Sequence, residues 1–438
     1  MLRPLACLLV ALCAFLLPAE PGIQRGLFLF LLIGGLWVTE ALHLTVTALL
    51  VPLLAVGLGL LDTKKALASF ADPIIALFFG GFVLAAALRA HGLDRMLAAR
   101  VVLLARGHLL PAALLLFAAT AFISMWVSNT ATAAMMLPLA LGLVAGVDRE
   151  KERSTILFVL LGVGWMASLG GMGSLVGSPP NALAAAAAGW SFRDWFAVGL
   201  PALALLAPLA VAVLWLVLRP PLRHVRVTIA GDRIAWTRGT TLTLAVFALT
   251  VLLWMFSEPV GARLGIEKDT DALIAIAAAV LLVGSGALAW KDAERGVDWG
   301  VLLLFGGGLC LGAVLKSSGT SDWLAQGMVA HTGGLPTLVM LLALGAFIVL
   351  LSELASNTAA TALLLPLLVP LAPSLGLSAG EMAAFVALTA SCGFMLPVAT
   401  PPNAIVYGSG LVRQRDMIRT GFWLDAVCVL ALALMFAR

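Results

Sequence analysis

The sequence predicts an all-α polytopic membrane protein, and three observations predict this fold class. Of the 438 residues, 62% are hydrophobic and 11% are charged, whereas soluble globular domains carry roughly 25% charged residues. Apolar runs long enough to cross about 30 Å of hydrocarbon as helices recur from Leu5 to the C-terminus. The polar connections are short, and the longest covers residues 219–240. A soluble multidomain enzyme is therefore excluded, and no stretch is long enough for a nucleotide-binding domain.

Taken in order, the apolar runs predict about 11 transmembrane helices, at residues 5–18, 24–42, 43–61, 73–90, 156–188, 195–218, 240–257, 271–290, 300–316, 380–407 and 418–437. The first run follows Arg3 and resembles a signal peptide, but Pro21 would follow the cut, so we interpret this run as a membrane span. Segments 91–108 and 317–332 have polar residues at helical spacing, which is typical of helices lying at the membrane surface.

Two further apolar stretches, 109–146 and 335–371, are each interrupted midway by a Ser-Asn-Thr triplet. We predict that each is a re-entrant hairpin, which returns to the side from which it entered. With the N-terminus in the cytoplasm, this arrangement puts most lysines and arginines on the cytoplasmic side, including those of the 219–239 loop. Because cytoplasmic loops carry an excess of these residues, we expect a cytoplasmic N-terminus and a periplasmic C-terminus.

Three motifs occur twice in the same order, which predicts an internal repeat. They are Phe-Gly-Gly at 79–81 and 305–307, Ser-Asn-Thr-Ala at 128–131 and 356–359, and Ser/Thr-Pro-Pro-Asn at 178–181 and 400–403. The spans that carry Phe-Gly-Gly cross the membrane in opposite directions, so the copies are inverted, as in many secondary transporters. The expected domains are an N-terminal helix, a first inverted repeat, a cytoplasmic linker and a second inverted repeat, at residues 1–22, 23–218, 219–239 and 240–438.

Each Ser-Asn-Thr triplet precedes an apolar helix-forming run, which is typical of a helix N-cap. Within a membrane, the free N–H groups at such a helix start must line a cavity or bind a ligand, and the helix dipole adds a partial positive charge of about 0.5. Two such starts that approach each other from opposite sides suit a small dianion. The donors would come from Ser128, Asn129, Thr130, Ser356, Asn357 and Thr358.

The Pro-Pro pairs at 179–180 and 401–402 predict a second kind of site. Each pair removes N–H donors and pushes the preceding residue, Ser178 or Thr400, out of the α conformation, so each span is expected to unwind there. The freed carbonyl oxygens, with neutral side-chain oxygens nearby, suit a monovalent cation such as Na⁺. Each repeat is therefore expected to hold one cation site beside one anion-binding helix start.

Few other residues are candidates for chemistry. Glu353 is an acid within an apolar hairpin and is therefore a functional candidate, although it could instead accept hydrogen bonds from hairpin backbone. The five cysteines and five histidines show no metal-binding spacing. No pattern of nucleophile and base favours an enzyme within the membrane.

Residues 122–138 and 352–361, together with both Pro-Pro-Asn segments, strongly resemble the divalent anion/sodium symporter family of di- and tricarboxylate transporters. The resemblance covers nearly the whole chain. It implies a homodimer in which each protomer has a scaffold domain and a transport domain that moves like an elevator. It also implies a multi-pass protein of the bacterial inner membrane that contacts lipid. Because no soluble stretch is long enough for a nucleotide-binding domain and the basic residues lie in loops flanking apolar spans, we expect neither a nucleotide nor a nucleic acid as partner.

The same resemblance assigns site residues by position. The first Na⁺ site falls on Ser124, Ser128, Asn129 and Gly177, and the second on Ser352, Ala355, Asn357 and Ala399. The substrate carboxylates fall to Ser128, Asn129, Thr130, Ser178, Ser356, Asn357, Thr358, Thr400 and Pro401. Ser352 stands where many relatives have threonine, which keeps the hydroxyl group but loosens the second site.

The expected function is Na⁺-coupled symport of a C4 dicarboxylate such as succinate, malate or fumarate, with Na⁺ as the coupling ion. The alternatives within transport are a Na⁺-independent dicarboxylate exchanger and a sulfate or citrate transporter, because some relatives exchange substrates without sodium. An anion channel is the alternative from a different class, but two occluding cation sites near the midplane argue against a continuous pore.

Overall fold

The computed structural model describes residues 2–94, 96, 104–105, 108–148, 151–221, 236–266, 268–332 and 335–437. Every regular element in these ranges is a helix, which confirms the all-α fold class. Most of the surface helix predicted at 91–108, and residues 222–235 of the predicted linker, lie outside the described residues. At the other predicted surface segment, a helix runs over Thr320–Thr332.

The first half of the chain comprises α1 (Leu2–Leu12), η1 (Cys13–Leu16), α2 (Pro21–Thr39), α3 (Leu44–Gly57), α4 (Thr63–Ala68), η2 (Ser69–Ala71), α5 (Pro73–Ala90), α7 (Leu109–Ser124), α8 (Asn129–Leu143), α9 (Arg153–Gly171), η3 (Leu175–Gly177), α10 (Pro179–Ala188) and α11 (Phe192–Leu218). The second half comprises α12 (Arg238–Met255), α13 (Ser257–Leu264), α14 (Thr270–Gly284), α15 (Trp290–Gly296), α16 (Trp299–Ser317), α17 (Thr320–Thr332), α18 (Thr337–Leu354), α19 (Asn357–Leu368), η4 (Val369–Leu375), α20 (Ala379–Ala390), α21 (Pro401–Gly408) and α22 (Gln414–Phe436).

Nine helical stretches among the described residues are long and apolar enough to cross a membrane. Every expected crossing coincides with a helix or with a pair of consecutive helices. The number nine differs from about 11 for a physical reason. The helices α1, α3 and α14 and the broken pair α20 and α21 are shorter than 18 residues, whereas both arms of the second hairpin, α18 and α19 with η4, are long enough to count.

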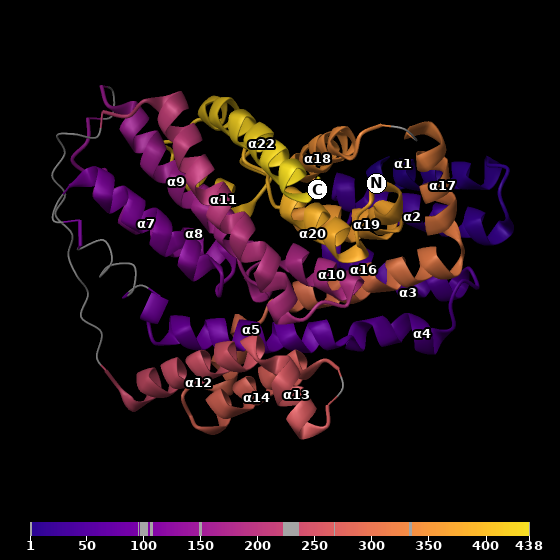
Figure 1. The fold of residues 1–438 in the computed structure, drawn as a ribbon, viewed down its shortest axis with the longest axis horizontal. Helices are drawn as coiled ribbons and strands as arrows, with labels where there is room; N and C mark the ends of the chain where they lie inside the picture. The colour runs from indigo at the N-terminus through magenta and orange to yellow at the C-terminus, as the bar shows by residue number, and fades with distance from the viewer. Residues whose placement is uncertain are drawn as a thin grey trace.

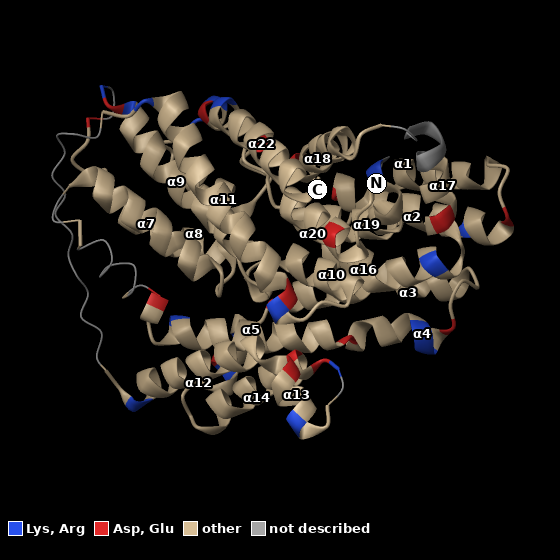
Figure 2. Cartoon of the chain, in the orientation of Figure 1, with Lys and Arg blue, Asp and Glu red and all other residues tan. Residues whose placement is uncertain are grey.

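Charged residues lie mostly near helix ends. Figure 2 shows α7, α8, α9 and α11 in tan over most of their length, with blue and red concentrated near helix ends and connections. Several large apolar side chains on the helix surfaces are exposed, including Leu53 (66%), Leu216 (70%) and Val280 (64%). Apolar helix surfaces with exposed leucine and valine suit contact with lipid rather than water.

Among the glycine contacts that join the halves of the chain, two are counterparts of each other. On α5, Gly80 lies so close to Ala275 of α14 that a Cβ atom at Gly80 would overlap the Ala275 carbonyl oxygen. On α16, a Cβ atom at Gly307 would lie 2.6 Å from the Cβ atom of Ala48 in α3. Gly307 and Ala275 stand 227 residues after Gly80 and Ala48, one residue more than the 226 between the two Phe-Gly-Gly copies, so the two contacts are close counterparts under the repeat. The repeated Phe-Gly-Gly motif therefore supplies small residues through which each repeat packs against the other.

Replacing Gly80 by alanine is expected to lower the thermal stability of the detergent-solubilised protein. The new methyl group would push α5 away from the backbone of α14, and overpacking of this kind costs about 1–3 kcal/mol. Gly284, at the end of α14, is a matched control because a Cβ atom there meets nothing within 4 Å. Gly284→Ala is expected to keep or slightly raise the melting temperature. Equal melting temperatures for the two variants would contradict the close contact.

The helices form two groups, which are defined by their contacts. The frame helices are α2–α5 and α12–α17, in which α5 packs on α14 and α16 packs on α3. The hairpin helices are α7–α11 and α18–α22, in which α7 packs on α9 and α10 packs on α20. Figure 1 shows α5, α12 and α14 along one edge of the molecule and α7, α9, α11 and α22 across from them. The groups meet where α16 contacts α10 and α19 and where α2 contacts α19.

Candidate functional site

The first hairpin turns back within the group of hairpin helices. The helix α7 ends at Ser124 and α8 begins at Asn129, so the tip between them is not α-helical. Ser128 caps α8, because its hydroxyl oxygen accepts a hydrogen bond from the backbone N–H of Ala131 at 3.4 Å. The other N–H groups of the first turn have no intrahelical acceptor. The tip therefore presents free backbone donors, as the sequence predicts for this triplet.

Three oxygen atoms, from Ser124, Ala167 and Gly177, meet the side-chain amide of Asn129 beside this tip and form with it what we call the first oxygen cluster. The Ser124 hydroxyl group lies 2.9 Å from the side-chain amide of Asn129 and 2.5 Å from the Ala167 carbonyl oxygen. The amide of Asn129 also reaches the carbonyl oxygens of Ala167 and Gly177, at 3.1 and 3.2 Å. The orientation with nitrogen toward them satisfies both ends of the amide, so Asn129 donates to both and to the Ser124 hydroxyl oxygen. Turning the amide over would place its oxygen there instead, and uncharged oxygens would then converge in the manner that suits a hard cation.

The second oxygen cluster, from Ser352, Asn357 and Ala390, repeats this geometry. The Ser352 hydroxyl group lies 2.7 Å from Oδ1 of Asn357 and 2.5 Å from the Ala390 carbonyl oxygen. Ser352 and Asn357 stand 228 residues after their counterparts in the first cluster. Ala399 is close by, since a Cβ atom at Gly393 would lie 3.5 Å from Ala399 Cβ and 3.8 Å from Asn357 Oδ1. The two repeats thus build the same arrangement twice.

Both Pro-Pro segments follow helices that end early. The helix α9 ends at Gly171 and α10 begins at Pro179, while α20 ends at Ala390 and α21 begins at Pro401. The intervening stretches contain no α-helix, so their carbonyl groups are free of the helical hydrogen-bond pattern. These stretches carry the carbonyl groups of Gly177 and of the residues around Ala399, at the places where the sequence predicts unwinding.

One asparagine in each repeat holds the unwound stretch in shape. The side-chain nitrogen of Asn181 donates to the carbonyl oxygens of Gly171 and Ser174, at 2.8 and 2.7 Å. The side-chain nitrogen of Asn403 donates to the carbonyl oxygens of Gly393 and Leu396, both at 3.0 Å. These two acceptors stand 222 residues after those of Asn181. Each asparagine is almost fully buried, at 0% and 1% exposure. The asparagine of the Pro-Pro-Asn motif is therefore a brace for the loop, a role that the sequence alone did not predict.

The predicted substrate residues lie at the starts of four helices, α8, α10, α19 and α21. Ser178 and Thr400 are buried, at 3% exposure each, and are the extended N-cap residues before the two Pro-Pro pairs. Thr130 and Pro401 are exposed and take no part in either oxygen cluster. The helix α8 packs against α21, and α10 packs against α19. In both cases a helix of one repeat thus packs against a helix of the other.

The second hairpin contains a buried acid. Glu353 is 2% exposed, and its carboxylate oxygens accept hydrogen bonds from the backbone N–H groups of Met395 and Leu396, at 2.7 and 2.8 Å. The sequence makes Glu353 a candidate either for a direct functional role or for accepting hydrogen bonds from backbone, and the structure shows such hydrogen bonds. The donors lie in the unwound stretch between α20 and α21 rather than in the hairpin. Glu353 thus holds this stretch through two of its N–H groups, and Asn403 holds it through two of its carbonyl groups.

From its place near a span end, Asp425 of α22 is expected to serve packing or to snorkel, but its carboxyl group lies beside that of Glu353 and is 4% exposed. In the first repeat the same two positions are occupied by Met125 and Leu203, which flank Gly173. An apolar contact in one repeat is therefore replaced by a pair of acids in the other. Only an alignment of the repeats through α11 and α22 would have revealed this exchange from the sequence.

Comparison with known proteins decides the family. A sequence profile described as a citrate transporter matches residues 35–390, which is most of the chain. The chain belongs to this family of transporters. An uncharacterized transporter of Haemophilus influenzae is 48% identical over 426 residues, which cover 96% of this chain and 92% of the relative. The sodium-dependent dicarboxylate transporter SdcS of Staphylococcus saprophyticus is 30% identical over an alignment of 469 positions, which covers 98% of this chain and 89% of SdcS.

The fold of the transporter is also found among solved structures. The YdaH transporter of Alcanivorax borkumensis aligns with a TM-score of 0.61 and 16% sequence identity, over 90% of this chain and 98% of that chain. These findings confirm the resemblance to di- and tricarboxylate transporters and a multi-pass membrane protein. They also confirm that the protein is a transporter rather than an enzyme.

Proposed function

We propose that this transporter is a symporter that couples the inward movement of Na⁺ to the uptake of a C4 dicarboxylate such as succinate, malate or fumarate across the inner membrane. One observation carries the proposal, which is the repeated pairing of an oxygen cluster with a capped helix start in each half of the chain. The similarity to the relative named a sodium-dependent dicarboxylate transporter supports it.

The two cation sites of this proposal are the oxygen clusters. Ser124, Ser128, Asn129 and Gly177 hold the first Na⁺, and Ser352, Ala355, Asn357 and Ala399 hold the second. The ligands are neutral, so a bound Na⁺ keeps its positive charge and attracts the dianion to the neighbouring helix starts. The membrane potential then contributes about 2.3 kcal/mol per positive charge for every 100 mV, in addition to the Na⁺ gradient.

The substrate site of this proposal lies between the two hairpin tips. Each carboxylate of the substrate is held by the hydroxyl, amide and backbone donors of one Ser-Asn-Thr triplet, at 128–130 or 356–358, with Ser178, Thr400 and Pro401 at the sides. Charge-assisted hydrogen bonds from neutral donors, with the helix dipoles behind them, favour a dianion without a fixed cationic side chain. A substrate with two separated carboxylates matches two donor groups of equal kind.

The movement we propose is an elevator-type displacement within a homodimer. The hairpin helices form the transport domain and the frame helices form the scaffold domain of each protomer, with a cytoplasmic N-terminus and a periplasmic C-terminus. The inverted repeats supply two related conformations, one open to each side of the membrane. The glycine contacts between Gly80 and Ala275 and between Gly307 and Ala48 support a rigid scaffold.

Citrate is the second candidate substrate, because the matching family profile is described as a citrate transporter. The proposed site residues are all uncharged, however, so no cationic side chain among them would bind the third carboxylate of citrate.

The test is uptake of radiolabelled succinate into proteoliposomes that contain no substrate, with an inward Na⁺ gradient or with choline in place of Na⁺. Accumulation that requires Na⁺ is the expected result. Uptake that ignores Na⁺ but needs internal dicarboxylate would replace the symporter with an exchanger. Absence of succinate uptake under both conditions, with uptake of citrate or sulfate, would replace the substrate.

A further inference from the structure

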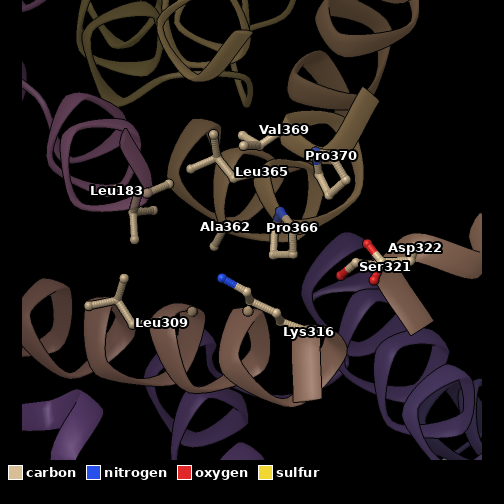
Figure 3. Close-up of a pocket in the computed structure, with 13 residues that line it drawn as sticks. Leu183, Leu309, Lys316, Ser321, Asp322, Ala362, Leu365, Pro366, Val369 and Pro370 are labelled. Atoms are coloured by element: carbon tan, nitrogen blue, oxygen red, sulfur yellow. The ribbon is translucent and has the colours of Figure 1, made fainter. Parts of the chain in front are cut away.

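A cavity of about 340 Å³ lies between the frame helices and the hairpin helices. Its walls come from α16 and α17 on one side and from α10 and α19 on the other (Figure 3). The helices α10 and α19 both begin at the proposed substrate site. The lining residues Leu183 and Leu365 lie four and eight residues beyond Pro179 and Asn357, which is about 6 and 12 Å along a helix. None of the lining residues belongs to an oxygen cluster, so the cavity is separate from both clusters and lies on the boundary between the two groups.

One cation faces this cavity. Lys316, in the last turn of α16, directs its ammonium group into the space between α16 and α19 and away from Ser321 and Asp322, as Figure 3 shows. No ion pair found among the described residues includes Lys316. The rest of the wall near the ammonium group is apolar and includes Leu309, Leu365 and Pro366.

These surroundings specify the chemistry of a ligand. The ammonium group favours one anionic head, and the apolar wall favours a hydrocarbon body. The carboxylate of Asp322 at the far side of the cavity disfavours a second negative charge. The volume is at the low end of the range of about 300–1,000 Å³ for ligand pockets, which suits a small single-chain molecule rather than a lipid with two acyl chains.

We propose that this cavity is a binding site for an organic monoanion with an apolar body, such as a medium-chain carboxylate, and that Lys316 binds its carboxylate group. The ligand wedges α16 and α17 against α10 and α19. If the hairpin helices slide past the frame helices, as the proposed function requires, an occupied cavity holds the two groups in one position. The ligand then lowers the maximal uptake rate without competing with the dicarboxylate.

Binding of radiolabelled octanoate to the full-length protein in lipid nanodiscs tests the site without reference to transport. Background partition is measured with protein-free nanodiscs. We expect saturable binding that is about tenfold weaker in Lys316→Met, because one charge-assisted contact is lost. Lys64→Met, at an exposed lysine of α4 outside the cavity, is the matched control and is expected to bind as the unmodified protein does.

A second variant fills the cavity without changing its charge. A Cβ atom at Gly312 of α16 lies 3.6 Å from the Pro366 ring, so Gly312→Leu extends into the space and is expected to abolish saturable binding. Octanamide, which has the same body and no charge, is expected to displace octanoate poorly. Equal binding by Lys316→Met, equal displacement by octanamide, or no saturable binding to the unmodified protein would each overturn the proposal. Because none of these outcomes involves succinate uptake, they are distinct from a failure of the proposed symport.

Discussion

Replacing either Asn129 or Asn357 by alanine is expected to reduce dicarboxylate uptake at least about a hundredfold. Each asparagine belongs to an oxygen cluster and also starts a helix of the proposed substrate site, so one substitution removes contacts to both the cation and the anion. Initial rates of succinate uptake into proteoliposomes, at saturating Na⁺ and succinate, measure the effect.

The control for these variants is Thr250→Ala. Thr250 is also buried, at 3% exposure, but lies on α12 and donates a hydrogen bond only to the Val246 carbonyl oxygen of the same helix. Its uptake is expected to stay within about twofold of the unmodified protein. Size-exclusion chromatography shows whether each asparagine variant remains folded. Normal uptake by both folded asparagine variants would remove the clusters from the mechanism.

A disulfide between the frame helices and the hairpin helices is expected to stop transport reversibly. A Cβ atom at Gly308 of α16 would lie 3.1 Å from the Cβ atom of Ala362 in α19, close to the 3.5–4.5 Å that disulfides require. In a background without the five native cysteines, oxidised Gly308→Cys/Ala362→Cys is expected to lose about nine-tenths of its uptake, since the proposed sliding of α19 past α16 is blocked. Reduction with dithiothreitol is expected to restore the uptake.

The matched control joins two hairpin helices to each other. A Cβ atom at Gly164 of α9 would lie 3.7 Å from the Cβ atom of Val406 in α21, which also suits a disulfide. Oxidised Gly164→Cys/Val406→Cys is expected to keep its uptake, because both helices belong to the part that moves. Full activity of the oxidised Gly308→Cys/Ala362→Cys protein would rule out relative movement of the two groups.

The sequence predicted the membrane class, the helix pattern and the residues of the hairpin tips because these depend on local signals. Long apolar runs, triplets such as Ser128 to Thr130, and Pro-Pro pairs act on the backbone within a few residues. The repetition of these signals also predicted that two similar arrangements would form. The helices α8 and α19 indeed begin within the two triplets, at Asn129 and Asn357.

The rest of the site depends on contacts between distant segments. The carbonyl groups of Ala167 and Ala390 belong to the oxygen clusters, yet an alanine within an apolar helix carries no sequence signal for such a role. The position of Asp425 beside Glu353 likewise exists only after α22 has packed on α18. The cavity at Lys316 exists only after four separate helices have packed. Crossed packing of α8 with α21 and of α10 with α19 is equally invisible in a linear reading.

The glycine contacts between repeats have a consequence for how the protein is made. The contact residue Ala48 of α3 is synthesised 259 residues before Gly307 of α16, and Gly80 of α5 is synthesised 195 residues before Ala275 of α14. During that interval Gly80 and Ala48 have no native neighbour across the contact, and the half-made chain depends on lipid or on the insertion machinery to cover it. The frame helices therefore assemble only after the second half of the chain has been inserted. A chain that stops after α11 is expected to be degraded by membrane proteases rather than to persist as a stable half-transporter.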